Sequence, residues 1–199
     1  MVDADTAVPA SIRRLDSADA GRLIRLVEAY DELQTVLQCC ERLLTLLNGH
    51  PSGADDLGVE ALWTLALLSY GRAFGPGGLT EEDLRDSGSD GDAVKGHRVL
   101  LHLRDYHADA SANPRETYTV GVAQGADGAV NAVAVTSVGA PRVDAAAVRQ
   151  AGAIAFPLCG VLDERIGAMQ GQILADVRDI SRAELAAMDL IEVAAPAEG

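Results

Sequence analysis

The sequence predicts a mainly α-helical protein, a helical bundle with a small antiparallel β-hairpin inserted. In most of the chain, apolar residues recur every three or four positions, the period of a helix that buries one face. At about residues 117–137, two short β-branched runs flank a glycine-containing turn, which indicates a hairpin. A chain of 199 residues can bury one core, so we expect a single helical domain over 16–190, with flexible segments at 1–15 and 191–199.

A long amphipathic helix is expected first, with Asp16 or Ser17 as its cap. Its apolar residues form one continuous stripe: Leu23, Leu26, Val27, Tyr30, Leu33, Leu37, Cys40, Leu44 and Leu47. Asn48 and Gly49 then end the helix. A stripe of this length suits either the inside of a bundle or the seam of a dimer, and it is the reason in the sequence to expect a homodimer.

Residues 58–74 predict a second helix that is apolar on nearly every side and should therefore be the most buried one. Arg72 is the lone charge in its C-terminal half. Two interpretations of Arg72 stay open: a solvated arginine at the carboxyl end of the helix, or a buried arginine with an acidic partner. After the glycine-rich break at 75–78, Thr80 is expected to cap a short acidic helix.

The next predicted helix begins near Asp92 and holds three of the four histidines, His97, His102 and His107. These histidines are five positions apart, whereas two metal ligands on a helix are three or four apart, so we expect no metal ion. Arg104 and His107 are three positions apart and share one face, with His97 further back on the same face.

This face of arginine and histidine supports three interpretations. It is a solvated or interface surface, a catalytic pair made by Arg104 and His107, or a binding surface without catalysis. Asp105 and Asp109 suggest a further structural role, an ion-pair network that holds this helix to the helix of Arg72. The chain has no phosphate-binding loop, nucleophile elbow, zinc-protease motif or dinucleotide fingerprint, so we expect no cofactor.

The two β-branched runs of the hairpin pose a stability problem, because an isolated hairpin is marginal in water. We therefore expect one face of it to lie on the helices. A helical pattern follows over residues 143–178, and Pro157 inside it should kink or split the helix. Ser181 is expected to cap a short last helix.

The formal net charge of -14 repels phosphate backbones and disfavours broad binding of nucleic acid. Three cysteines without a metal-binding spacing favour a reducing, cytoplasmic location. The chain starts without a signal-peptide pattern, and its uninterrupted apolar runs are far short of about 20 residues, so we expect no membrane segment. Arginine accounts for all but one of the 16 basic residues, which indicates a GC-rich genome.

Two segments resemble a family of actinobacterial and phage helical proteins that has no assigned activity. Residues 70–74, Tyr-Gly-Arg-Ala-Phe, resemble the Tyr-x-Arg-x-Phe end of an apolar helix in that family. Residues 104–111, followed by Asn113 and Glu116, resemble its second motif, Arg-Asp-x-x-x-Ala-His-Ser. The order of elements is similar from about residue 20 to residue 178.

That family is similar in turn to the HEPN superfamily of helical bundles. Many of those proteins are metal-independent ribonucleases of toxin and antiphage systems, with an arginine and a later histidine at a dimer interface. This chain has Ala110 at the position of the family histidine. The resemblance therefore implies a HEPN-like, homodimeric, non-catalytic module that binds a protein partner. The alternative that it implies is a variant ribonuclease in which Arg104 and His107 act on RNA.

Overall fold

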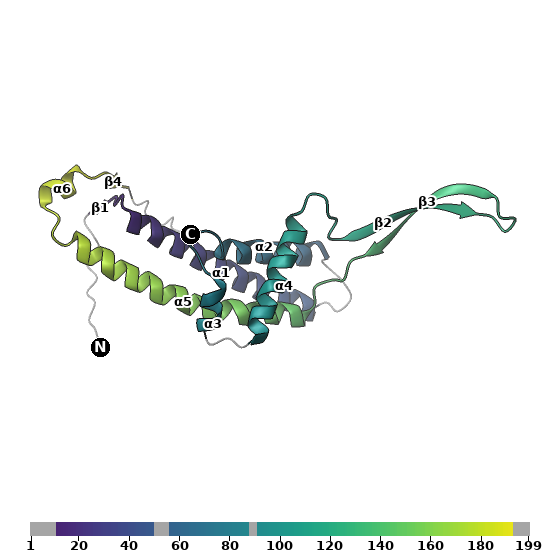
Figure 1. The fold of residues 1–199 in the computed structure, drawn as a ribbon, viewed down its shortest axis with the longest axis horizontal. Coiled ribbons are helices and arrows are strands. Elements are labelled where there is room, and N and C mark those ends of the chain that lie inside the picture. Colours follow the sequence, from purple (N-terminus) through teal and green to yellow (C-terminus); the bar gives the residue numbers. More distant parts are fainter. Residues whose placement is uncertain (1–10, 50–55, 88–90, 193–199) are drawn as a thin grey trace.

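The computed structural model describes residues 11–49, 56–87 and 91–192, and within them the fold is mainly helical, as predicted. The helices are α1 (Ala18–Gly49), α2 (Asp56–Ala73), α3 (Glu81–Asp86), α4 (Gly91–Ala108), α5 (Ala145–Val177) and α6 (Arg182–Ala187). Figure 1 shows α1, α2 and α5 running along the long axis of the molecule, with α4 crossing them.

Two small antiparallel sheets accompany the helices. Their strands are β1 (Ile12–Arg13), β2 (Glu116–Gln124), β3 (Val130–Gly139) and β4 (Leu190–Ile191). β1 pairs with β4, with Ile12 opposite Ile191, so the two ends of the described chain meet. The segments predicted as flexible, 1–15 and 191–199, thus each contribute to a paired strand. Residues 1–10 and 193–199 lie outside the described residues.

The core lies where α1 packs against both α2 and α5. The buried residues of α1 are Leu26, Ala29, Leu33, Val36, Cys39, Cys40 and Leu43. This stripe is rotated slightly from the predicted one, since Val27 is exposed and Val36 is buried. Because the stripe faces two helices of the same chain, α1 uses it inside the bundle.

The predicted helix starts are confirmed by their side-chain hydrogen bonds. Ser17 accepts a 3.1 Å hydrogen bond from the backbone N–H of Ala20 at the start of α1. Thr80 and Ser181 each form a reciprocal capping box, at α3 and α6 respectively. Such caps satisfy backbone donors that have no partner within the helix, so each start is fixed locally.

Pro157 was predicted to kink or split its helix. α5 runs unbroken through it, so the proline does not split the helix. Proline removes the N–H that would bond to the carbonyl group of Ala153. Ala153 is exposed, so water can hydrate that carbonyl. Ile154 and Leu158 are buried on either side of the proline, and their packing stabilises the helix across it.

α5 is also long and apolar enough to cross a membrane by length and composition. We expected no membrane segment because the sequence has no long uninterrupted apolar run. The criterion met by α5 is instead the mean hydropathy of an 18-residue window, which tolerates polar residues. Core helices of soluble proteins, which are mostly buried, pass the same test. α5 contributes Val148, Ile154, Leu158 and Leu162 to the core, and 39% of the window is buried inside the protein.

The predicted hairpin is confirmed, but the prediction that one of its faces lies on the helices is wrong. Its turn spans Gly125 to Gly128, and Gly128 has a φ of 79°, which favours glycine. Nearly every residue of β2 and β3 is exposed. Figure 1 shows the pair projecting from one end of the helical body. We call residues 116–139 the hairpin arm. Composition predicts such strands, but it does not predict what covers them.

Candidate functional site

The residues predicted to carry chemistry lie on the side of α4 that faces α2. His97, Arg104 and His107 each lie against a residue of α2, as described below. α4 therefore uses this side for packing within the chain. Whether any of the three side chains is free for chemistry depends on the partners that each one already has.

His97 belongs to a buried aromatic cluster. Its Nδ1 shares a 2.8 Å hydrogen bond with the hydroxyl of Tyr70, and its ring centroid lies 4.4 Å from that of Phe74. Burial lowers the pKa of His97, although the nearby Glu81 carboxylate opposes the effect. Burial also raises the pKa of Tyr70. Both groups are therefore neutral near pH 7, and with 3% of His97 exposed this pair joins α2 to α4 out of reach of a substrate.

Arg104 lies across Gly71 of α2, where a Cβ atom would overlap its Cδ. Glycine at position 71 is what allows this close approach. The Nε of Arg104 donates a 2.9 Å hydrogen bond to Oδ1 of Asp105, and its NH2 donates to the same oxygen. The arginine therefore has an acidic partner on its own helix, and a phosphate group would have to compete with it.

His107 is half-buried and lies near the C-terminal end of α4. Its Nδ1 is 3.3 Å from the Oγ1 of Thr64 on α2. Burial lowers the pKa of His107, and the Glu60 carboxylate opposes this effect. Arg104 and His107 thus share a side of α4 but have different hydrogen-bond partners.

The expected ion-pair network between α4 and the helix of Arg72 is not formed by the predicted residues. Asp109 accepts hydrogen bonds from the backbone N–H and the hydroxyl of Ser111, at 2.8 and 2.7 Å. Arg72 is exposed, and its NH1 lies 3.4 Å from Oε1 of Glu32 on α1. The interpretation of Arg72 as a buried arginine is therefore wrong, because its side chain leaves α2 on the side of α1 and solvent.

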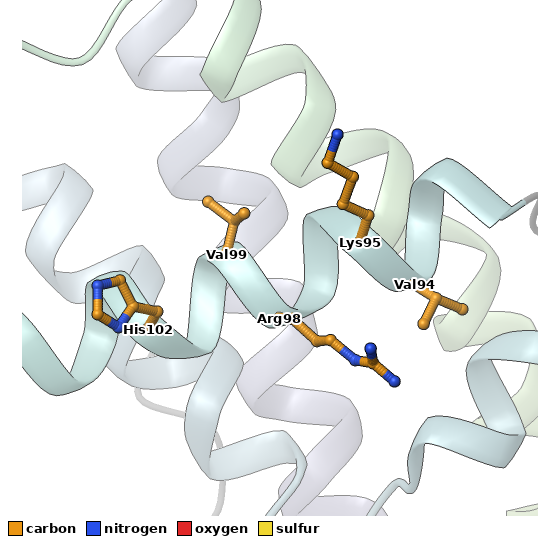
Figure 2. Close-up of a pocket in the computed structure, with 5 residues that line it drawn as sticks. All are labelled: Val94, Lys95, Arg98, Val99 and His102. Carbon is orange, nitrogen blue, oxygen red and sulfur yellow. The ribbon is translucent and has the colours of Figure 1, made fainter.

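An open depression of about 390 Å³ lies on the outer side of α4. Figure 2 shows that its lining comes entirely from this helix: Val94, Lys95, Arg98, Val99 and His102. Lys95 and Arg98 point in different directions, and the NH2 of Arg98 lies 2.9 Å from Oε1 of Glu81. The positive charges thus do not converge on one ligand, and neither Arg104 nor His107 lines the depression.

The structure also contains an ion pair that the sequence reading missed, between Asp83 of α3 and Arg165 of α5. Asp83 is 3% exposed and also accepts hydrogen bonds from Thr80. Burial raises the pKa of Asp83, but hydrogen bonds from Arg165 and Thr80 outweigh it and bring the pKa below its usual value. The capping box was visible in the sequence; Arg165 was not, since it lies 82 positions further along the chain.

The hairpin arm has two chemically different faces. Residues directly opposite each other in the two strands lie on the same face, and successive residues alternate between faces. Tyr118 is opposite Ser137, Val120 opposite Val135, and Val122 opposite Val133. We call the large apolar residues of this side the valine face: Tyr118, Val120, Val122, Val133 and Val135. The other side is built mainly of threonine, alanine and glycine, for example Thr119 opposite Thr136.

The valine face is open to solvent along its whole length. Its five side chains are 59–71% exposed. The base of the arm is tied to the body by Arg115, whose Nε donates hydrogen bonds of 2.6 and 2.8 Å to the Glu60 carboxylate of α2. The arm is therefore anchored at one end, and its apolar face is accessible to a partner.

The chain matches no family model, no curated protein and no solved structure in the comparisons made. The resemblance to HEPN proteins accordingly stays a prediction. Within residues 11–49, 56–87 and 91–192, no group of three or more His, Cys, Asp or Glu side chains could hold a metal ion. The function has to be inferred from the α4 side chains and the hairpin arm.

Proposed function

We propose that this protein is a non-catalytic, HEPN-like interaction protein of the cytoplasm, and that the hairpin arm is its binding element. The observation that carries this proposal is the exposed valine face. Contiguous exposed apolar patches larger than a few hundred Å² are uncommon on soluble monomers and often mark binding sites. A two-stranded hairpin is also marginal alone in water, so contact with a protein partner would stabilise the arm as well as the complex.

The partners of the α4 side chains support the absence of catalysis. Cleavage of RNA needs a cation that is free to stabilise the developing charge on phosphate, and a base or acid that reaches the reacting atoms. Arg104 already pairs with Asp105, and His107 lies half-buried against Thr64. The net charge of -14 also opposes the approach of RNA.

The catalytic question is tested by incubating labelled RNA with the wild type, His107→Ala and His102→Ala. His102 is the matched control, because it is an exposed histidine of the same helix. We expect the same background cleavage from all three proteins and the same growth of host cells that express them. Cleavage by the wild type that disappears in His107→Ala and persists in His102→Ala would overturn the non-catalytic proposal.

The binding question is tested with a variant in which residues 116–139 are replaced by a short glycine–serine loop. Glu116 and Gly139 are directly opposite each other, so a short loop can join the flanking residues. We expect the variant to keep its helical circular dichroism and to lose association with any protein bound by the wild type. Undiminished association would show that the arm is not the binding element.

A variant HEPN-type ribonuclease is the second candidate, because one observation favours it. Arg104 and His107 lie on the same side of α4, and burial keeps the His107 imidazole neutral near pH 7, as a general base requires. In this alternative the activity would fall at acid pH, as His107 takes up a proton. The cleavage assay above decides between the two functions.

A further inference from the structure

We infer that the valine face of the hairpin arm binds the same face of a second copy of this chain, so that two arms form the interface of a homodimer. The inference rests on the proposed function and names its partner. It also moves the expected dimer contact from α1 to the arm. The α1 stripe, which suggested a dimer in the sequence, is already packed against α2 and α5.

The charge distribution favours a second copy. The arm carries two charged residues. Glu116 lies at its base on the side of the valine face, where its carboxylate accepts a hydrogen bond from Tyr118, and Asp127 lies in the turn; the four valines between them are uncharged. A strongly charged partner would find no complementary group along the four valines. An uncharged β-branched surface fits another surface of the same kind, as a two-fold interface requires.

The projection of the arm would keep the two negatively charged helical bodies of a dimer apart. Two bodies with a formal charge of -14 each repel one another. Nine residues of β2 extend about 30 Å, and Figure 1 shows the arm pointing away from the helices. Two arms that overlap with their bodies at opposite ends separate those bodies by well over the Debye length, about 8 Å at physiological salt, so the repulsion is largely screened.

The available area matches the need of a small dimer. The five side chains of the valine face are 59–71% exposed, and each offers on the order of 100 Å² of apolar surface. With both faces fully covered, two copies would bury about 1,000 Å², the size of a weak or transient protein interface. Two hairpins packed face to face at about 10 Å make a small β-sandwich, with the threonine sides outside.

The test compares Val120→Asp with Thr119→Asp by sedimentation and light scattering at tens of micromolar protein. The two positions are neighbours on β2 but on opposite faces, so each variant adds one negative charge to the same strand. We expect the wild type and Thr119→Asp at twice the 20.7 kDa of one chain, and Val120→Asp with a dissociation constant raised at least about tenfold. Val120→Thr keeps the β-branched shape and serves as a second variant if Val120→Asp does not fold. It should also raise the dissociation constant of the dimer.

A wild type that stays monomeric, or a dimer that survives Val120→Asp and Val120→Thr, would overturn the inference. Equal dissociation by Thr119→Asp would also overturn it, because the effect would then not depend on the valine face. These results are distinguishable from failure of the proposed function. If the protein is a monomer whose arm binds a different protein, the dimer inference is wrong and the proposed function stands. If RNA cleavage depends on His107, the proposed function is wrong and the dimer measurement still decides the inference.

Discussion

Apolar residues are buried in the helical body and exposed in the hairpin arm. In the body, Leu33, Leu43, Leu158 and Leu162 are fully buried between α1, α2 and α5. In the arm, Val133 and Val138 are 71% and 72% exposed. Both regions form their regular backbone hydrogen bonds locally: the helices within themselves, and β2 and β3 along the one edge that they share. The difference therefore lies in tertiary packing: the body is complete within one chain, and the arm is not.

The side chains that could take part in catalysis and the most exposed apolar side chains lie in different regions. His97, Arg104 and His107 carry the chemistry suggested by the sequence, and they lie on the packed side of α4. The valine face of the arm carries none of these side chains, and its five apolar residues are exposed to solvent. Accessibility and reactivity thus occur in different places, which favours binding over catalysis.

The largest expected effect comes from truncating the core. Leu158→Ala should lower the free energy of unfolding by about 2–5 kcal/mol, because it leaves a cavity between packed helices. Val133→Ala in the arm should change it by less than about 0.5 kcal/mol, since the side chain is already in water. Urea denaturation at low protein concentration measures both. Similar losses for the two variants would contradict the contrast between body and arm.

A smaller effect is expected at the ion pair that joins α3 to α5. Asp83→Ala removes the capping box and leaves Arg165 without its carboxylate, so the free energy of unfolding should fall by about 1–3 kcal/mol. Asp86→Ala, an exposed acid of the same helix, is the control and should have little effect. Because the pKa of Asp83 is lowered by folding, its stabilisation should be lost as pH falls below about 4. An equal loss in Asp86→Ala would show that the ion pair is not responsible.

Acid should also weaken the contact between α2 and α4. The pKa of His97 is lowered in the folded protein, so the unfolded chain binds a proton first, near its ordinary pKa of about 6.5. Stability should then decrease as pH falls from about 7 to about 5, and His97→Gln should reduce this dependence. His107 adds a slope of the same sign, because its pKa is lowered too. Thermal melts across this range, with His102→Gln as the control, measure the change; an unaltered slope in His97→Gln would contradict it.

The smallest effect on the body is expected from removing the arm. Replacement of residues 116–139 by a short loop should leave a cooperative melt, with the free energy of unfolding changed by about 1 kcal/mol or less. The physical reason is that β2 and β3 make their main contacts with each other, not with helices. Loss of cooperative unfolding in this variant would show that the arm belongs to the folding unit.

The elements were predictable because their signals are local. The spacing of Leu26, Leu33 and Cys40 indicated the first helix, and the threonine of the capping box marked the start of α3. Pro157 does not split α5, because the local rule behind that prediction ignores packing on both sides of the proline and water on its exposed side. The buried face of the hairpin was wrongly predicted for a related reason. The stability rule requires a cover for the strands, but it does not say that the cover belongs to the same chain.

The sequence by itself determined the helices, their caps, the hairpin and its two-faced alternation, since each depends on residues a few positions apart. It also placed Arg104 and His107 on one side of a helix. The tertiary structure decided what those side chains meet: α2 for His97 and His107, and Gly71 with Asp105 for Arg104. It likewise decided that the valine face is exposed and not packed on the helices that the structure describes. Such contacts depend on how distant segments pack, which the periodicity of a sequence does not encode.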